Sequence, residues 1–409
     1  MAQFITSVIV AAFVSFGVIL PACAYLIFLE RKVAAWVQDR IGPNRTNFSF
    51  GILPIPEHWH MFGLGQALAD GLKLFVKEDY NPPFVDRALF ILAPLIVVVP
   101  AMIGWAVIPW GGIIDWNGTP LHVSVAPIHI GVVYILAIGS LAVYGVVIGA
   151  YASNNKYSFL GGLRATAQML SYEIPMGICV LIMILTFATT STDDMVHLQA
   201  GAGLATGTWG LFLHPLLAVI FFTCVLAECN RAPFDLAEAE QELVGGYHTE
   251  YSSMKWALYF LGEYMHMITG SAFFCVLFLG GWDVIPFVGE FPLVAQGEWW
   301  WVILVAFLKF NVFALKITFL LFLMMWIRWT LPRFRFDQLM RLAWRGLIPI
   351  TLAVLLISAV LVAIDAPPLS FLAANIAVAV AAAIIGPLIP QGAEGNRKVK
   401  LAGSRFNPV

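Results

Sequence analysis

Carboxylates are concentrated in one short stretch of the sequence, AECNRAPFDLAEAEQELVGGYHTEY, at residues 227–251. The stretch holds six of the chain's 24 acidic residues against a single arginine: Glu228, Asp235, Glu238, Glu240, Glu242 and Glu250, with Arg231. Carboxylates this close together titrate as a coupled set, which can take up and release protons. The residue types therefore indicate proton handling, although a run of acids is more often a solvated helix face.

The spacing within this stretch separates one acid from the others. The sequence predicts a short helix over residues 234–244, which the following glycine pair ends. On that helix Asp235, Glu238 and Glu242 fall close together and suit a solvated face. Glu240 falls among apolar residues instead, so a solvated surface does not explain it.

Other carboxylates need a partner because they lie within or at the end of apolar runs. Glu228 closes one run, where the helix dipole disfavours negative charge, and Arg231 is a candidate counter-charge. Glu173 and Glu263 are expected about 10 and about 14 Å inside two further runs. A charged residue near mid-bilayer costs about 2.5–3.5 kcal/mol, so each should face a partner or a hydrated cavity.

Two lysines in a later apolar run, Lys309 and Lys316, lie two helical turns apart on one face. One buried acid and one buried base could form an ion pair that only joins two helices. Acids in two runs together with two lysines favour instead a path for protons or ions.

The cysteines and histidines indicate no metal site. The five cysteines form no C-x-x-C pair, and no Cys/His cluster has the spacing of zinc or iron–sulfur ligands. Most of the cysteines lie in apolar runs and are expected to be small packing residues. If the protein serves redox chemistry, its metal centres are expected on other chains.

The elements that position these residues are predicted to be membrane-spanning helices. The chain has 409 residues, 60% hydrophobic and 11% charged, whereas soluble domains carry about 25% charged residues. We expect an all-α polytopic membrane protein, one integral membrane domain over residues 1–409, with nine transmembrane helices. The spans are expected at residues 4–29, 87–110, 127–151, 167–190, 208–228, 254–280, 299–327, 346–364 and 368–390.

Basic residues set the predicted orientation. Lysine and arginine follow the odd-numbered spans and are absent from the four other loops. The positive-inside rule then places the N-terminus outside and the acidic stretch in a cytoplasmic loop. The basic tail, from Arg397 to Arg405, is also expected in the cytoplasm, so the number of spans must be odd.

One amphipathic segment, QALADGLKLFVKED at residues 66–79, is too short to cross the bilayer. Its apolar side chains share one helical face, and Asp70, Lys73 and Lys77 share another. The pattern predicts a helix lying flat at the cytoplasmic membrane surface. Such a helix either packs on neighbouring spans, which the pattern alone favours, or forms the lip of a cavity.

Five long motifs together resemble one family. The motifs are ERKVAAWVQDRIGPNR, ADGLKLFVKED, GGLRATAQMLSYEIPMG, AECNRAPFDLAEAEQELVGGYHTEYSSMKWALYFLGEY and RWTLPRFRFDQLMRLAWRGLIP. They cover about residues 20 to 350 in order, which is far more specific than any single short pattern. The family is the quinone-site membrane subunit of respiratory NADH–quinone oxidoreductase, complex I, which is the H subunit in bacteria and subunit 1 in mitochondria.

The resemblance implies a multi-pass subunit of a bacterial cell membrane with no complete active site of its own. Ubiquinone or menaquinone would be the substrate, while NADH, FMN and the iron–sulfur clusters would be bound by other chains. The implied partners are the soluble quinone-site subunit, the cluster-bearing subunits and the antiporter-like membrane subunits.

The resemblance also implies roles for individual residues. A quinone chamber would be framed by the interfacial helix and by spans one and six. The positions that match its motifs are Glu30, Arg31, Arg40, Asp70, Lys73, Arg333 and Arg335. An acidic funnel would begin the proton path, and its matching positions are Glu173, Glu228, Asp235, Glu238, Glu240, Glu242 and Glu263.

The chain departs from the family pattern in two places. Residues 47–62 replace a short Gly/Pro link near the expected chamber mouth, and the ninth span with the tail, residues 366–409, extends past the common eight-span core.

Two other functions stay open. The basic amphipathic segments argue against the homologous subunit of a membrane-bound hydrogenase. A stand-alone proton-coupled transporter would more typically show broken helices in two related halves.

Overall fold

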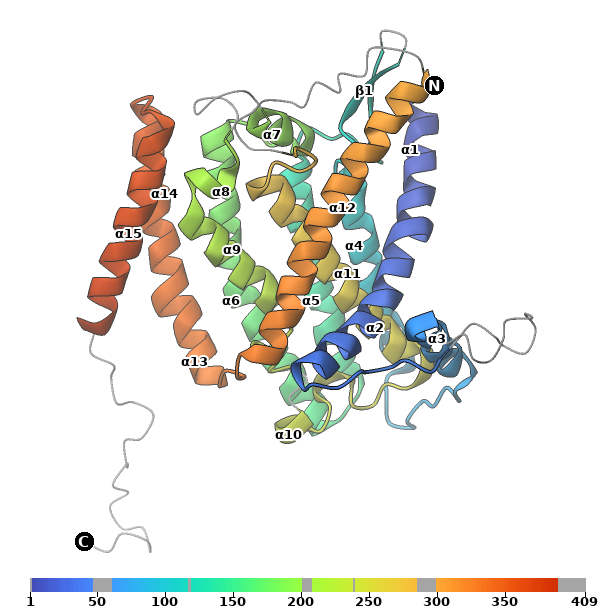
Figure 1. Ribbon diagram of the computed structural model, residues 1–409. Coiled ribbons are helices and arrows are strands. Elements are labelled where there is room, and N and C mark those ends of the chain that lie inside the picture. Colours follow the sequence, from blue (N-terminus) through green and yellow to red (C-terminus); the bar gives the residue numbers. More distant parts are fainter. Residues whose placement is uncertain are drawn as a thin grey trace, which may run out of the picture.

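The computed structural model describes residues 2–46, 61–116, 119–200, 208–237, 240–284 and 299–388. Most of its helices run side by side in one bundle (Figure 1). One end of the bundle, here called the hairpin end, carries strands β1 (Ile113–Trp116) and β2 (Thr119–His122) and helix α7 (Thr192–Gln199). The opposite end, the α10 end, carries helices α3 (Gln66–Val76) and α10 (Glu240–Leu243).

Eight helical segments of the described chain are long and apolar enough to cross a membrane, which confirms the predicted all-α membrane class. Two of them contain π-helical turns, at Phe13–Ile19 and at Leu342–Leu347. The segments consist of α1 (Ala2–Ala12) continuing into α2 (Leu20–Val37), α4 (Arg87–Ile103), α5 (Gly131–Ala152), α6 (Lys156–Phe187), α11 (Ser253–Phe278), α12 (Trp299–Thr330), α13 (Phe336–Arg341) continuing into α14 (Ile348–Ala363), and α15 (Pro368–Leu388).

The predicted fifth span is interrupted. It consists of α8 (Gly210–Leu213) and, after a break at His214, α9 (Pro215–Glu228). Proline suits the first turn of a helix because its missing N–H has no partner there, so α9 begins at Pro215. The 14 residues of α9 cover about 21 Å, which is short for a span. The count of nine spans and the orientation of the chain therefore stay predictions.

The predicted amphipathic helix is present as α3 and ends three residues earlier than expected. Its C-terminal neighbour, Lys77, has an extended backbone with ψ 139°. No residue of α3 is buried, and its apolar side chains, Leu72 and Phe75 among them, are exposed. An apolar helix face that the chain leaves uncovered suits a position at the membrane surface, which stays a prediction.

The helix predicted from residue 234 is wrong over its first four residues. Residues 231–237 form turns, in which the N–H of Leu236 donates to the carbonyl of Phe234 at 2.9 Å. Phe234 and Leu236 are buried in the core, and the Pro233 carbonyl accepts from the N–H of Phe334 at 3.1 Å. These tertiary contacts outweigh the local helix propensity. Glu238, the side chain of Glu240 and residues 47–60 of the insertion lie outside the described part of the chain.

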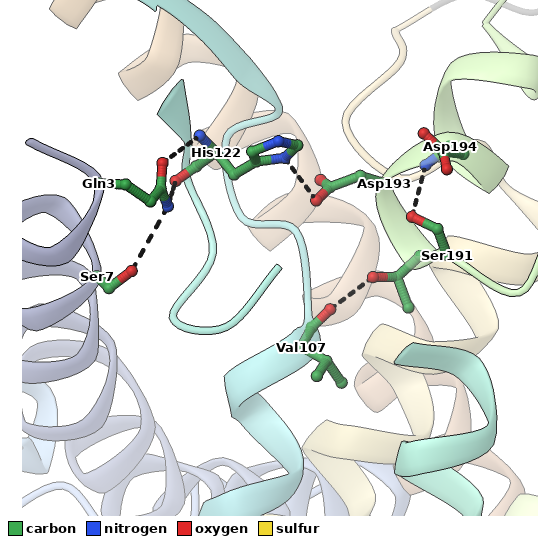
Figure 2. A network of polar contacts seen from close by, with 8 residues as sticks. Gln3, Ser7, Val107, His122, Ser191, Asp193 and Asp194 are labelled. Carbon is green, nitrogen blue, oxygen red and sulfur yellow. Dashed lines mark hydrogen bonds and ion pairs between the residues drawn. The ribbon is translucent and has the colours of Figure 1, made fainter. Parts of the chain in front are cut away.

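Side chains from three elements, α1, β2 and α7, join the hairpin end together (Figure 2). Gln3 of α1 bonds to the backbone of His122 twice, because its Nε2 donates to the carbonyl at 3.2 Å and its Oε1 accepts from the N–H at 3.1 Å. His122 Nδ1 lies 3.1 Å from Oδ2 of Asp193 on α7. Thr192 donates to the carbonyl of Val107, just after α4, at 2.7 Å. The hairpin is thereby fixed to α1 and to α7, and α7 is fixed in turn to the residues just after α4.

Two further side chains secure the hairpin end of α11. Gln199 Oε1 accepts from the N–H groups of Gly210 and Gly280, at 3.0 and 3.1 Å. Lys316 Nζ donates to the carbonyl oxygen of Leu279 at 2.6 Å. The ammonium is thus held at the carboxyl end of α11, where the helix dipole favours a cation.

All five cysteines are free thiols buried among these helices: Cys23, Cys179, Cys224, Cys229 and Cys275. None is more than 2% exposed. This agrees with the packing role expected from the sequence.

Candidate functional site

A cavity of about 760 Å³ lies near the α10 end, between α2, α3 and α11. This volume is within the usual range of about 300–1,000 Å³ for sites that bind small molecules. Most of the lining is apolar, from residues such as Leu20, Ile27, Leu74, Leu258, Phe260 and Leu261. The charged lining residues are Glu30, Arg31, Asp70, Arg40, Arg231 and Arg328. The cavity therefore combines an oily wall with a few charges, four of them on residues that the sequence assigned to a chamber.

The α3 side of the cavity is held to α2 by an ion pair. Arg31 Nη1 lies 2.7 Å from Asp70 Oδ2, and Gln66 Nε2 donates to the other Asp70 oxygen at 3.0 Å. Thr46 Oγ1 donates to Gln66 at 2.6 Å. Because Arg31 is half exposed, the pair contributes little stability and serves mainly to orient α3.

The inner wall carries a buried group of charges, here called the arginine cluster: Glu30, Arg231, Glu263, Tyr264 and Arg328. Glu30 pairs with Arg328 and accepts from the Tyr264 hydroxyl at 2.5 Å. Arg231 lies between the two acids, 3.9 Å from Glu30 and 3.5 Å from Glu263, with its guanidinium 4.3 Å from the centre of the Tyr264 ring. Four elements, α2, α11, α12 and the turn after α9, meet in this cluster.

The arginine cluster keeps its charges out of water at a cost that only pairing offsets. Arg231 is 3% exposed and Glu263 is 7% exposed. Tyr247 donates to the second oxygen of Glu263 at 2.7 Å. Removing one partner would leave an uncompensated buried charge, which typically costs about 3–5 kcal/mol. The cluster is therefore sensitive to any new charge that enters the cavity.

A tight turn after α9 brings Arg231 into the cluster. Asn230 has φ 49°, a left-handed conformation that asparagine tolerates better than most residues. Gln168 of α6 holds this turn, since its Nε2 donates to the Ala227 carbonyl at 2.8 Å and to Asn230 Oδ1 at 3.2 Å. In the described chain Arg231 pairs with Glu30 and Glu263, and its role as a counter-charge for Glu228 stays a prediction.

Glu228 and Glu173 form a second acidic group beside the arginine cluster. Glu228 ends α9 and interacts electrostatically with Glu173 of α6. A Cβ on Gly139 of α5 would lie 3.4 Å from Glu228 Oε1, so this carboxylate faces α5 as well. Cys229, the next residue, lies within electrostatic reach of Glu228, Arg231 and Glu263. Glu228 therefore lies next to the arginine cluster.

The remaining predicted residues are placed differently. Asp235 pairs with Arg333 at 2.8 Å, which joins a predicted funnel acid to a predicted chamber base away from the cavity lining. Glu242 pairs with Arg164 at 2.6 Å and is exposed, as expected for a solvated face. Two other bases, Lys73 and Arg335, are exposed and lie outside the described lining.

Sequence reasoning missed three polar residues of this region, Tyr247, Tyr264 and Arg328. Arg328 stands at the end of an apolar run, which is a usable signal that it needs a buried partner or the membrane surface. The two tyrosines carry no such signal. The described residues include no group of three or more His, Cys, Asp or Glu side chains suited to a metal ion.

The chain is similar to known proteins over most of its length. A family model described as NADH dehydrogenase matches residues 10–359. The NADH-quinone oxidoreductase H subunit, form 1, of Cytophaga hutchinsonii is 44% identical over 343 residues, 84% of this chain and 93% of that protein. The corresponding H subunit, form 1, of Geobacter sulfurreducens is 42% identical over 370 residues, 88% and 96% of the two chains. The H subunit of Leptospira biflexa is 42% identical over 355 residues, 84% and 92%.

Proposed function

The chain belongs to the NADH dehydrogenase family, as a membrane subunit of NADH–quinone oxidoreductase, and from this premise we propose how its cavity and its acids serve that enzyme. The family resemblance expected from the sequence is confirmed. The chain is a multi-pass subunit of a multi-subunit enzyme whose substrate is a quinone. None of these relatives is named as a hydrogenase subunit or as a transporter.

We propose that the cavity is the passage through which a ubiquinone or menaquinone enters. The observation that carries this proposal is an oily cavity whose inner wall is the arginine cluster. The apolar lining suits an isoprenoid tail. Arg40 lines the cavity and Lys73 stands on α3 beside it, so both can attract the polar head. Arg31 and Asp70 hold the α3 wall in place.

The arginine cluster would sense the charge that develops during reduction. Reduction of a quinone takes up two protons. Until both protons have arrived, the reduced quinone head carries negative charge. Such a charge attracts Arg231 and Arg328, which weakens their hold on Glu30 and Glu263. A carboxylate with a weaker counter-charge binds a proton more readily. The response then passes to Glu228 and Glu173 as part of one coupled set, together with Glu240. Asp235, Glu238 and Glu242 would extend this set toward the surface.

The rest of the enzyme would supply the redox groups. We place FMN and the iron–sulfur clusters on partner subunits, with a soluble quinone-site subunit above the α10 end and antiporter-like subunits in the membrane. The α10 end would face the cytoplasm of a bacterial cell. A protease site placed after Val409 tests this orientation, because cleavage from outside intact cells would exclude nine spans with a cytoplasmic tail.

The coupling role is tested with neutral substitutions of the acids. Glu228→Gln, Glu240→Gln and Glu263→Gln should each leave the enzyme assembled. Each should lower NADH–quinone turnover and proton uptake together, by at least about tenfold, because proton transfer by a positioned group contributes at least that much. Both rates are measured in vesicles that contain the purified variant enzyme.

A control comes from the same acidic stretch. Glu250 accepts from Asn155 at 2.5 Å and is assigned no part in coupling, so Glu250→Gln should keep both rates. If all three test variants turn over quinone and take up protons at wild-type rates, the acids are a docking surface for another subunit and the coupling role is wrong.

A further inference from the structure

A buried polar contact joins α15 to the break before α9, at a distance from the cavity. Asn375 Nδ2 on α15 lies 2.8 Å from His214 Nδ1, and Thr186 Oγ1 on α6 lies 3.0 Å from His214 Nε2. His214 is fully buried and Asn375 is 1% exposed. The Phe371 ring of α15 also meets the imidazole edge to face, with centroids 5.5 Å apart. Polar groups this deep among apolar helices require a specific reason.

The directions of these hydrogen bonds follow from the partners. The Asn375 amide nitrogen also donates to the Phe371 carbonyl at 2.8 Å, so it is a donor and His214 Nδ1 accepts. The proton of the neutral imidazole is then on Nε2 and is donated to Thr186 Oγ1. The Thr186 hydroxyl donates in turn to the Ile182 carbonyl at 2.8 Å. Every ring nitrogen is engaged, which fixes one tautomer and one ring orientation.

The position of His214 in the chain allows this contact to act on the whole of α9. Its N–H donates to the Gly210 carbonyl at 2.8 Å, and its own carbonyl accepts from Ala218 at 3.1 Å, so it links α8 to the first turn of α9. The other end of α9, about 20 Å away, carries Glu228 and leads to Arg231. Because α9 is one unbroken helix, a shift at His214 moves both charged residues.

The same neighbour holds both ends of α9. Thr186 and Gln168 both belong to α6, and they bond at the two ends of α9. The third partner, Asn375, belongs to α15, which lies beyond the residues matched by the family model. A helix outside the family match is thus connected to the helix that ends in Glu228.

We propose that His214 is a positioning residue for the coupling reaction. Asn375, His214 and Thr186 form a clamp that fixes α9 along its axis and so sets the separation of Glu228 from Glu173 and of Arg231 from Glu263. The inference rests on the proposed coupling function and adds a distant part of the fold to it.

The clamp carries a cost that a purely structural contact would avoid. Asn375 Oδ1 is buried and has no hydrogen-bond partner among the described residues. Leucine has the same number of side-chain heavy atoms as asparagine, branches at the same carbon and buries no polar atom, so Asn375→Leu is expected to fold and assemble. This makes the substitution a suitable probe of the clamp.

The test compares purified enzymes with Asn375→Leu and with Thr186→Val. In each, NADH oxidation by an artificial electron acceptor should stay normal, while quinone turnover per flavin should fall about three- to tenfold, the range expected from losing one buried hydrogen bond. The pH profile of turnover should also shift, because the distance between Glu228 and Glu173 affects how both bind protons. Thr223→Val is the matched control, since the Thr223 hydroxyl on α9 donates within its own helix, to the Val219 carbonyl at 2.8 Å.

Each outcome of this test either supports or rejects the clamp or the coupling function. Normal quinone turnover per flavin and an unchanged pH profile in an assembled clamp variant would overturn the proposal, even if less enzyme assembles. If Asn375→Leu does not assemble, Thr186→Val alone decides, because it removes one hydroxyl and preserves shape. Wild-type rates in all three of Glu228→Gln, Glu240→Gln and Glu263→Gln would remove the coupling function itself. A slow Glu228→Gln enzyme with normal clamp variants would reject the clamp alone.

Discussion

The two ends of the bundle use polar residues in opposite ways. At the α10 end, buried charges line a cavity, and Arg231 is shared between Glu30 and Glu263 at 3.9 and 3.5 Å. At the hairpin end, Gln199 and Gln3 each bond backbone groups at about 3 Å in both directions, as donor and as acceptor. One end therefore has ion pairs beside a space, whereas at the other end two neutral glutamine side chains hold the backbone by hydrogen bonds.

This difference separates two tasks that one membrane subunit must perform. Neutral hydrogen bonds with satisfied partners hold a single geometry and respond little to charge. Ion pairs beside a cavity respond strongly when another charge arrives, because each buried charge depends on its partner. We therefore expect substitutions at the α10 end to change turnover, and substitutions of hairpin-end residues outside the clamp at His214 to change stability.

The largest expected effect is at Arg231. Arg231→Gln removes the charge between Glu30 and Glu263, and loss of one partner from a buried pair typically costs about 3–5 kcal/mol. Quinone turnover of the purified enzyme should fall at least about tenfold, with NADH oxidation by an artificial acceptor preserved. Arg341→Gln is the control, because Arg341 is exposed and donates within its own helical segment, to the Asp337 carbonyl. Equal turnover in the two variants would contradict a special role for the cluster.

A smaller effect is expected at the mouth of the cavity. Arg40 lines the cavity and is exposed, with Gln38 as its hydrogen-bond partner. Arg40→Ala should lower quinone turnover about three- to tenfold, since an exposed charge contributes less than a buried one, and leave assembly intact. Arg87→Ala at the same end should have no effect. Loss of assembled Arg40→Ala enzyme in membranes, measured by flavin content, would show that Arg40 serves the fold instead.

The smallest expected effect is at Asp193 of the hairpin end. Burial raises the pKa of Asp193, which His122 and His197 partly offset. An acid whose pKa is raised by folding stabilises the fold when protonated, so its contribution is present at low pH and is lost as pH rises through that pKa. Asp193→Asn should remove this pH dependence of thermal unfolding, with a change below about 1 kcal/mol and unaltered quinone turnover. A large fall in the quinone turnover of Asp193→Asn would show that the hairpin end does not differ from the α10 end in its effect on turnover.

Apolar runs predicted where most helices lie, but not where polar side chains begin or interrupt them. Helix α6 starts at Lys156, eleven residues before the predicted span, because Asn155 caps it by accepting from the Tyr157 N–H at 2.9 Å. The break at His214 follows from Pro215, which the run of apolar letters concealed. The β hairpin was missed, although Asn117-Gly118 is a sequence signal for a two-residue hairpin turn.

The residues of the candidate site were easier to predict than the pairs that they form with one another. Four predicted chamber residues do line the cavity, because each belongs to a motif with a local signature. The pairing of Glu30 with Arg328 joins residues 298 positions apart, and no spacing rule reaches that far. Proximity along the chain was also a poor guide to partners, since Arg231 stands three residues after Glu228 in sequence and pairs with Glu30 and Glu263.

The buried cysteines make this chain a convenient background for site-directed labelling. Each of the five thiols is at most 2% exposed and lies inside the bundle, out of reach of water-borne maleimides. A single cysteine introduced at an exposed site such as Lys73 would then be the one thiol on this chain to carry a spin label or fluorophore. Opening and closing of the wall beside α3 could be followed by spectroscopy without first replacing any native cysteine.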